Sequence, residues 1–593
     1  MSSEAATPSR RQGMASGVRM LAALVLLLWP LVPMALASRD AQADPLPQLA
    51  SWTAFTAAAV VVAGVAHAII RRRFATAAGA VAGLYATICT LLAAYRLAMH
   101  DWLDLEFLLA IPSDSVKTAY KSLGAGRTAM GVLALLVCTA LYAVAFASIA
   151  RTIAKLRGRT RYGMAAAALT AVSFVTLPHT TLLLPTENLR TAPVPPLFPK
   201  ASYTVTPGES VFIVQLESLN GIAINGEYDV GDPGRRGASE TLRLLGRDGI
   251  YFPYVWSHDV QTHRAQQSIL CGSVRNLRKN SVFEQRAIDR PCMPELFRAA
   301  GYRTVFLSSY TDPLFGKTRD IAERSGFTDI HFSDYMQRGD KKALWGYEEN
   351  AFFRRSFEYL RKTYRPDERL LVFFVVTAHH VGFSRRRMDD TQWFVDPREK
   401  QVAKYLESAR HQDESLQTFR DEFMRFTGGA AHLLVTGDHS YPLGLYKSIV
   451  SSVGATVDNY ITSMLYVPPK QRAPEFATGK VVKEIHGHSD ILPTIAELVS
   501  RKPQENSLVP VMLRASARGG DYERCHVMVQ PFDLPSVTVA REKTMYTYRF
   551  SSSCILKYTL TFDPLRQNGA GSTCGVSYAD FERLHGCARY RRP

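Results

Sequence analysis

Apolar residues are distributed very unevenly along this chain of 593 residues. Residues 1–185 consist largely of Ala, Leu and Val in long runs, whereas the remainder has the mixed composition of a globular domain. A helix needs roughly 20 consecutive apolar residues to cross a lipid bilayer. Five runs reach that length and predict a bundle of five transmembrane helices, at Val18–Ala37, Trp52–Ile70, Ala75–Tyr95, Thr128–Ala150 and Gly163–Pro185. The first run also fits a signal peptide, but an uncleaved anchor is favoured because four further runs follow it.

The loops between these runs predict how the chain is oriented. Basic residues gather in the loop after the second run, as Arg71, Arg72 and Arg73, and again in the loop after the fourth. In the loop of residues 38–51 the only basic residue is Arg39. By the positive-inside rule the N-terminus is cytoplasmic, and five crossings place everything after Pro185 outside. We therefore expect a protein integral to a membrane, with its globular part on the outer side.

Composition indicates further domain boundaries, and the net charge indicates which class of partner the chain binds. A linker with five prolines occupies residues 191–208, between a transmembrane domain (1–190) and a catalytic domain (209–508), and a cysteine-containing subdomain (509–593) follows. The formal net charge of +17 favours anionic partners. No nucleic-acid-binding pattern accompanies that charge. A phospholipid surface or a phosphate-bearing substrate therefore fits better than nucleic acid.

Six of the eight cysteines lie in the part predicted to be outside. They are Cys271, Cys292, Cys525, Cys554, Cys574 and Cys587. An even number in an oxidising compartment predicts up to three disulfides. A Cys271–Cys292 pair is favoured because it would brace the segment that carries the candidate nucleophiles. Free buried thiols are the alternative.

Three apolar strands of the globular part end in residues that bind metals. The run Val211–Leu216 leads to Glu217, Leu370–Val376 leads to His379 and His380, and Ala431–Val435 leads to Asp438 and His439. Open α/β sheets place ligand-binding groups at the carboxyl ends of such strands. The recurrence predicts a metal site on a doubly wound sheet, and an adjacent Asp–His pair suits Zn²⁺ or Mn²⁺.

The stretch His258–Gly272 offers three nucleophiles, Thr262, Ser268 and Cys271. A hydroxyl is a poor nucleophile at its ordinary pKa and needs a neighbouring base or metal. The residues alone leave the choice among the three open.

Nine segments in fixed order carry a resemblance to a known family. They are VFIVQLESLN, DGIYFPYVWS, THRAQQSILCG, PELFRAAGYRTVFL, RSGFTDIHFSDY, TAHHVGF, YLESARHQDESLQTF, VTGDHS and HSDILPTIAEL. Most of residues 210–500 resembles the lipoteichoic acid synthase and phosphoethanolamine transferase branch of the alkaline phosphatase/sulfatase superfamily. The resemblance implies an exported α/β domain with a central, mostly parallel sheet flanked by helices, behind a five-helix bundle in the bacterial inner membrane.

Site residues follow from the resemblance position by position. Thr262 would be the nucleophile and a metal ligand, together with Glu217, Asp438 and His439. The cofactor would be a divalent metal, Zn or Mn. His380 would hold the substrate phosphate, and His488 would serve a second metal or the substrate. Further phosphate contacts, for which a structural or solvated role is an equal alternative, are His263, Arg264 and Arg319.

The implied reaction transfers a phospholipid headgroup, phosphoglycerol or phosphoethanolamine, to a glycan or lipid acceptor of the cell envelope through a phosphothreonine. The donor would be phosphatidylglycerol or phosphatidylethanolamine. The family usually has Pro where this chain has Gly382, and Val509–Pro593 aligns only through a sulfatase-like Tyr546–Pro564.

Two other classes remain. A sulfatase is suggested by Cys271-Gly-Ser-Val-Arg275, which partly matches the motif whose Cys becomes formylglycine, although Ser273 replaces its Pro; a related phosphoester hydrolase belongs with it. The third class is a non-catalytic membrane scaffold or sensor.

Overall fold

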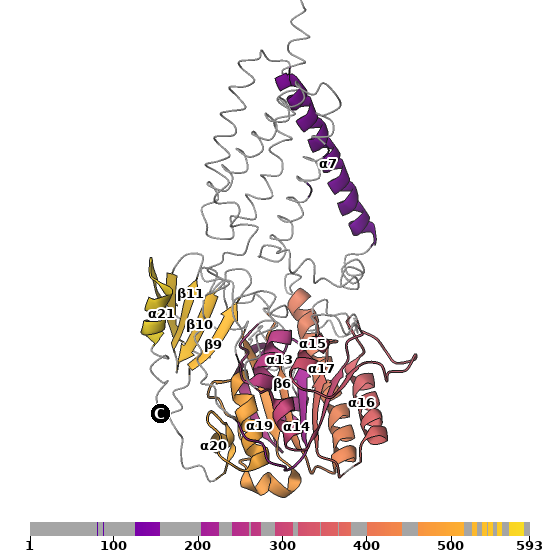
Figure 1. Cartoon of the computed structure of the whole chain (residues 1–593), viewed down its shortest axis with the longest axis vertical. Helices are drawn as coiled ribbons and strands as arrows, with labels where there is room; N and C mark the ends of the chain where they lie inside the picture. Colours follow the sequence, from indigo (N-terminus) through magenta and orange to yellow (C-terminus); the bar gives the residue numbers. More distant parts are fainter. Residues whose placement is uncertain are drawn as a thin grey trace, which may run out of the picture. The chain divides into compact units, whose positions relative to one another are not determined.

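The chain divides into two compact units. One comprises Met1–Leu109 and Ala119–Thr191, and the other Ala110–Thr118 and Ala192–Pro593. The structure is a computed structural model, shown in Figure 1. The residues that it describes are Ala80, Thr87, 125–154, 203–224, 240–259, 262–273, 291–311, 318–343, 345–365, 367–380, 400–441, 460–514, 525–530, 536–541, 544–549, 554–559 and 569–585.

In the first unit, helix α7 (Ala125–Ala154) contains the fourth apolar run of the sequence. Large apolar side chains are exposed along it, among them Leu133 (63%), Leu136 (61%) and Val144 (65%). Across the described ranges, no helix combines the length and apolar character that crossing a membrane requires. The other four predicted runs lie outside the described residues, apart from Ala80 and Thr87 in the third.

The second unit is built around an eight-stranded sheet of order β4-β3-β5-β1-β6-β7-β2-β8. Strands β4, β3, β5, β1 and β6 are parallel neighbours, β7 runs antiparallel to β6 and β2, and β2 pairs in parallel with β8. The expected α/β fold with a mostly parallel sheet is confirmed. The strands are β1 (Val211–Leu216), β2 (Ile250–Trp256), β3 (Arg303–Ser308), β4 (Asp329–Phe332), β5 (Leu370–Val375), β6 (His432–Gly437), β7 (Ile461–Val467) and β8 (His486–Gly487).

The central strands are apolar because helices cover both faces of the sheet. Every residue of β1, β5 and β6 is buried, which is the pattern of a parallel sheet between two helical layers. On one face α13 (Thr262–Cys271), α14 (Met293–Ala299) and α19 (Ile491–Ser500) pack against Val211 and Ile213. On the other, α12 (Glu240–Leu245), α16 (Glu349–Thr363) and α17 (Lys400–Thr427) pack against Phe212 and Val214 (Figure 1).

This topology brings the predicted ligands together. Strands β5, β1 and β6 are adjacent and parallel, so the segments that follow them leave the same edge of the sheet. Glu217 follows β1, His379 and His380 follow β5, and Asp438 follows β6.

A smaller antiparallel sheet of order β13-β12-β11-β10-β9 forms the C-terminal part. Its strands are β9 (Cys525–Gln530), β10 (Ser536–Arg541), β11 (Thr544–Arg549), β12 (Cys554–Thr559) and β13 (Gly569–Cys574), with α21 (Tyr578–His585) after them. Phe581 of α21 packs on Tyr548 of β11, with ring centroids 5.7 Å apart.

Two disulfides occur within the described ranges, Cys271–Cys292 and Cys554–Cys574. The first is the pairing that the sequence favoured, and it is confirmed. The second joins β12 to β13. Cys587 lies outside the described residues.

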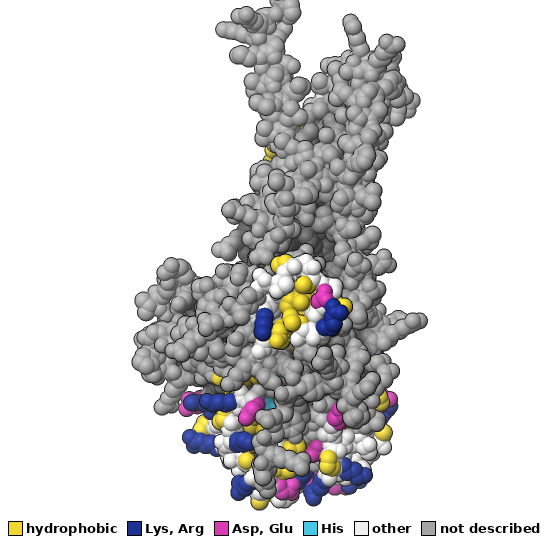
Figure 2. All heavy atoms as spheres, turned by 90° about the vertical axis from the view of Figure 1, so that its left-hand side faces the viewer, with side chains coloured by type: hydrophobic (Ala, Val, Ile, Leu, Met, Phe, Trp, Pro, Cys, Tyr) yellow, Lys and Arg dark blue, Asp and Glu magenta, His cyan; other side chains and the backbone are white. Residues whose placement is uncertain are grey.

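The described surface mixes both signs of charge. Figure 2 shows Lys and Arg side chains alongside Asp and Glu on the part of this face that is coloured.

Candidate metal centre and nucleophile

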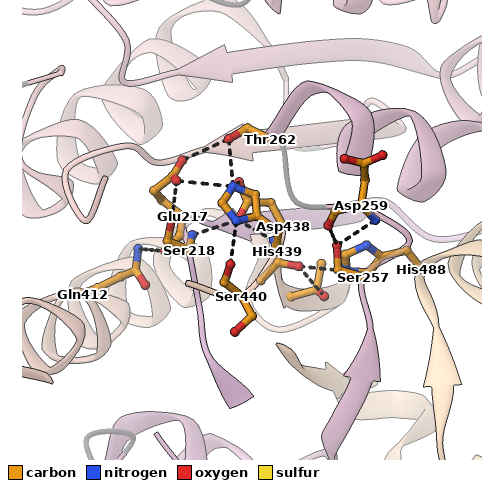
Figure 3. Close-up of polar contacts among 12 residues, drawn as sticks. Glu217, Ser218, Ser257, Asp259, Thr262, Gln412, Asp438, His439, Ser440 and His488 are labelled. Carbon is orange, nitrogen blue, oxygen red and sulfur yellow. Dashed lines mark hydrogen bonds and ion pairs between the residues drawn. The ribbon is translucent and has the colours of Figure 1, made fainter. Parts of the chain in front are cut away.

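Three predicted ligands converge at the carboxyl edge of the sheet. Glu217, Asp438 and His439 each offer one ligand atom, and these atoms lie within 4.8 Å of one another. Nε2 of His439 is 3.7 Å from Oε1 of Glu217 and 3.5 Å from Oδ2 of Asp438 (Figure 3). Both carboxylates are fully buried, and His439 is 9% exposed.

Hydrogen bonds from neighbouring groups aim these ligands. Oδ1 of Asp438 accepts from the backbone N–H of Ser218 (2.8 Å) and of His439 (2.6 Å). The hydroxyl of Ser218 donates to Oε1 of Glu217 at 2.6 Å. Nδ1 of His439 donates to the carbonyl of Ser440 at 3.0 Å, which leaves Nε2 on the side of the carboxylates. Such outer partners fix the orientation of metal ligands in known sites.

The residues present fit a divalent cation. Oδ2 of Asp438 is buried and has no hydrogen-bond partner among the described residues. A buried carboxylate oxygen without a hydrogen bond costs free energy, and a cation would reduce that cost. Two carboxylates and one imidazole are a ligand set that suits both Zn²⁺ and Mn²⁺.

Electrostatics support the same conclusion. Burial, and then the charge of Asp438, raise the pKa of Glu217 to about 8. Burial also raises the pKa of Asp438. Burial alone would lower the pKa of His439, but Asp438 and Glu217 raise it above its usual value. The protein by itself therefore disfavours two ionised carboxylates here, and a bound cation would reverse that preference.

Thr262 is the candidate nucleophile that lies at these ligands. It is the first residue of α13, and its Oγ1 is 3.4 Å from Oε2 of Glu217 and 3.4 Å from Nε2 of His439 (Figure 3). The Ser268 hydroxyl, two turns along the helix, donates to the carbonyl of Ser273 at 2.9 Å. Cys271 is bound in its disulfide. The tertiary structure thus separates three side chains that the sequence left equal.

The predicted phosphate ligand His380 packs against a tryptophan that sequence reasoning did not single out. The ring of Trp345 lies 4.5 Å from that of His380. Gly346 holds this segment close, because a Cβ there would lie 2.2 Å from the carbonyl oxygen of Ser309 and 2.5 Å from the hydroxyl of Thr377.

Tyr310 is a second residue that sequence reasoning missed. It is buried and pairs with Gly346 through an isolated β-bridge. Burial and the charges of Glu217 and Asp438 raise its pKa well above the usual value, while a hydrogen bond with Thr262 lowers it. The Tyr310 hydroxyl therefore belongs to the surroundings of the nucleophile.

His488 contacts the backbone next to one of the metal ligands. It is fully buried in the short helix η7 (His488–Asp490), and its Nε2 contacts the carbonyl of Gly437 at 2.9 Å. Burial, and then the proximity of His258, lower the pKa of His488 to about 3. A neutral His488 therefore donates to the backbone just before Asp438.

The three remaining predicted contacts differ in their surroundings. Arg264 is fully buried, and its Nε binds Oδ2 of Asp259, also buried. Arg319 lies over the ring of Phe332 at 5.1 Å and pairs with Glu323 at 3.8 Å. These contacts favour the structural alternative for both arginines over a phosphate contact. His263, next to Thr262, is partly buried.

Known proteins resemble this chain in fold. No curated protein matches it significantly. A protein of the alkaline phosphatase superfamily from Vibrio parahaemolyticus superposes with a TM-score of 0.50 and 14% identity, covering 67% of this chain and 90% of its own. The lipoteichoic acid synthase LtaP from Listeria monocytogenes superposes with a TM-score of 0.49 and 17% identity, covering 65% of this chain and 91% of its own. The zinc complex of the C-terminal periplasmic domain of EcEptC from Escherichia coli superposes with a TM-score of 0.41 and 14% identity, covering 56% of this chain and 94% of its own.

The sulfatase family model matches residues 211–500, which run from the start of β1 to the end of α19. This span contains the whole eight-stranded sheet and the metal-ligand triad. Residues 211–500 therefore match the sulfatase family, and their fold resembles that of the alkaline phosphatase superfamily protein.

Proposed function

We propose that this protein is a membrane-anchored, metal-dependent phosphotransferase. It moves a phospholipid headgroup, phosphoglycerol or phosphoethanolamine, to a glycan or lipid acceptor of the cell envelope. The observation that carries the proposal is the place of Thr262, whose Oγ1 lies 3.4 Å from one atom each of Glu217 and His439. A hydroxyl in that position is where a covalent phosphoenzyme would form.

Each half of the reaction follows from the residues at the site. A divalent cation in the triad would stabilise the deprotonated Thr262 hydroxyl and offset charge on the phosphoryl oxygens. Thr262 Oγ1 attacks phosphorus, the bond from phosphorus to the diacylglycerol oxygen breaks, and diacylglycerol gains the proton that Thr262 loses. The acceptor hydroxyl then attacks the phosphothreonine, and Thr262 recovers its proton. His380, whose ring lies against that of Trp345, would hold the phosphoryl group.

The disulfide of Cys271 argues against the sulfatase alternative. A sulfatase would require this cysteine as formylglycine, but its sulfur is bonded to Cys292. Thr262, not Cys271, lies against the ligand atoms. The scaffold alternative loses support because all three predicted metal ligands converge.

The proposed anchor is the N-terminal part of the chain. Five apolar runs support it, as do the exposed Leu133, Leu136 and Val144 of α7. Such side chains are stable against acyl chains but costly in water. An anchor of this kind would hold the catalytic domain at the outer surface of the bacterial inner membrane, where the phospholipid donor is concentrated.

The test is headgroup transfer by the purified full-length protein in vesicles. Labelled phosphatidylglycerol and phosphatidylethanolamine are supplied in separate reactions, and diacylglycerol release is measured with and without Mn²⁺ or Zn²⁺. We expect release from one donor, dependent on metal and absent in Thr262→Ala. Ser268→Ala, on the same helix but hydrogen-bonded away from the ligands, is the matched control and should retain activity.

Three results would change the conclusion. Persistent release by Thr262→Ala would remove Thr262 from its role. Headgroup recovered only as the free phosphate ester, with envelope acceptors present, would indicate a hydrolase. A protein that neither binds metal nor releases diacylglycerol would fit the scaffold alternative.

A further inference from the structure

One face of α17 carries a row of buried polar side chains that contact the segments around the metal-ligand triad. Tyr405, Ser408 and Gln412 are spaced three and four residues apart, so they lie on the same side of the helix. Tyr405 and Ser408 are fully buried, and Gln412 is 1% exposed. Buried polar groups in helices are normally there to make specific hydrogen bonds.

Tyr405 bonds to two backbone groups of the turn that follows β1. Its hydroxyl donates to the carbonyl of Ser218 at 2.8 Å and accepts from the N–H of Asn220 at 2.6 Å. Ser218, between them, has a φ of 52°. That left-handed conformation is unfavourable for a serine and persists only when its surroundings enforce it. Tyr405 supplies two of the enforcing bonds.

The conformation of Ser218 matters because Ser218 holds both carboxylates. Its backbone N–H donates to Oδ1 of Asp438 at 2.8 Å, and its hydroxyl donates to Oε1 of Glu217 at 2.6 Å. A change in φ at Ser218 would turn both donors away. The Tyr405 hydroxyl is therefore connected to two metal ligands through a single residue.

The same face of α17 also contacts the segments that follow β5 and β6. Oγ of Ser408 is 2.8 Å from Nδ1 of His379, next to the predicted phosphate ligand His380. The ring of Tyr405 stacks on that of Tyr441 at 5.7 Å. The Tyr441 carbonyl in turn accepts from the side chain of Asn220 at 3.0 Å. One helix face thus bridges the three strand ends that carry the site.

We propose that Tyr405 is a positioning residue that sets the metal affinity of the triad by holding Ser218 in its left-handed conformation. The inference rests on the proposed function in one respect, namely that the triad binds a divalent cation. Tyr405 touches neither metal nor substrate in this account. Removing its hydroxyl should weaken metal binding without changing the ligands themselves.

The experiment compares two tyrosine-to-phenylalanine variants of the full-length protein. Tyr405→Phe removes the hydroxyl and keeps the ring on Tyr441. Tyr466→Phe is the matched control, because Tyr466 is fully buried and its hydroxyl bonds Nδ1 of His432 at 2.9 Å, where β6 begins, at the other end of the strand from the ligands. Each protein is stripped with chelator and titrated with Mn²⁺ and with Zn²⁺ by calorimetry, and its melting temperature is recorded.

We expect Tyr405→Phe to bind metal about tenfold more weakly, at the low end of the effect of losing an outer partner of a metal ligand. Tyr466→Phe should lose stability to a similar extent but keep wild-type metal affinity. Added Mn²⁺ should restore the turnover of Tyr405→Phe, with the KM for phospholipid unchanged at saturating metal.

The outcomes distinguish this inference from the proposed function. Wild-type affinity in Tyr405→Phe, or an equal loss of affinity in Tyr466→Phe, would overturn the inference and leave the proposed function standing. A wild-type protein that binds neither cation would overturn both.

Discussion

Cys271, the last residue of α13, is covalently joined to Cys292, the residue just before α14. Thr262 begins the same helix, so the disulfide anchors the far end of the helix that presents the nucleophile. Both cysteines are buried at 1% exposure or less. The bond therefore belongs to the packed core beneath the site.

Removing this disulfide should destabilise the domain. The bond closes a loop with a sequence separation of 21, and loop-closure entropy for that length is worth about 3 kcal/mol. Denaturant unfolding of a Cys271→Ala/Cys292→Ala double variant measures the loss. Mass spectrometry of the wild-type peptides should find the two cysteines linked, and formylglycine at position 271 would contradict the assignment.

Removing a metal ligand should abolish binding of the cation without unfolding the protein. Asp438→Asn keeps an oxygen that can accept from Ser218 and removes the charge. Activity should fall at least about a hundredfold, because even an outer partner of a ligand costs roughly 10–100-fold. Elemental analysis after dialysis against Mn²⁺ or Zn²⁺ gives the stoichiometry. Asp329 is a half-buried carboxylate on the edge strand β4. The control variant Asp329→Asn should therefore still bind the cation at the triad.

The metal-free protein should lose stability as the pH rises. The pKa of Glu217 is about 8 in the folded protein, against an ordinary value of 4.5, owing to burial and then to Asp438. A raised folded pKa gives stability that is present below about pH 4.5 and is lost as the pH rises through about 8, because the folded state retains a proton that the unfolded state releases. Melting temperatures in chelator from pH 5 to pH 9 record the slope.

Two comparisons check that assignment. Glu217→Gln should flatten the slope, since it cannot ionise. Saturating Mn²⁺ or Zn²⁺ should reverse it, because the cation takes the place of the proton. A slope that survives in Glu217→Gln would assign the pH dependence to another group.

Trp345 should contribute to substrate binding and not to metal binding. Trp345→Ala removes the ring that lies 4.5 Å from His380, and an aromatic pair is worth about 0.5–1.5 kcal/mol. We therefore expect the KM for phospholipid to rise roughly two- to tenfold with metal affinity unchanged. Trp345→Phe keeps a ring and should recover most of the loss. An unchanged KM in the alanine variant would place the substrate elsewhere.

Arg264 should affect stability and not substrate affinity. It is paired with Asp259 inside the core, and removing one partner of a buried pair costs about 3–5 kcal/mol. Arg264→Met should unfold at lower denaturant with an unchanged KM. Arg264→Met/Asp259→Leu should recover part of the stability because no uncompensated charge remains. A selective rise in KM in the single variant would restore Arg264 as a phosphate contact.

The sequence predicted the parts of the site that depend on local pattern. Continuous apolar runs mark β1, β5 and β6, since strands buried on both faces carry no polar alternation. Parallel strands end at one edge, so Glu217, His380 and Asp438 could be grouped before their contacts were known. The disulfide between Cys271 and Cys292 was also predicted from the sequence.

Tertiary structure decided what depends on long-range packing. Thr262, Ser268 and Cys271 share one short helix, and only the placement of the start of α13 beside the segments that follow β1 and β6 puts Thr262 at the ligands. The burial of Arg264 required its partner Asp259 and the surrounding core.

Residues distant in sequence complete the site for the same reason. Trp345 reaches His380 because Gly346 allows a close approach of backbone that no local pattern encodes. The left-handed Ser218 depends on Tyr405, which lies 187 residues away in the chain. Periodicity reports which face of an element is buried, but it carries no information about which distant element covers that face.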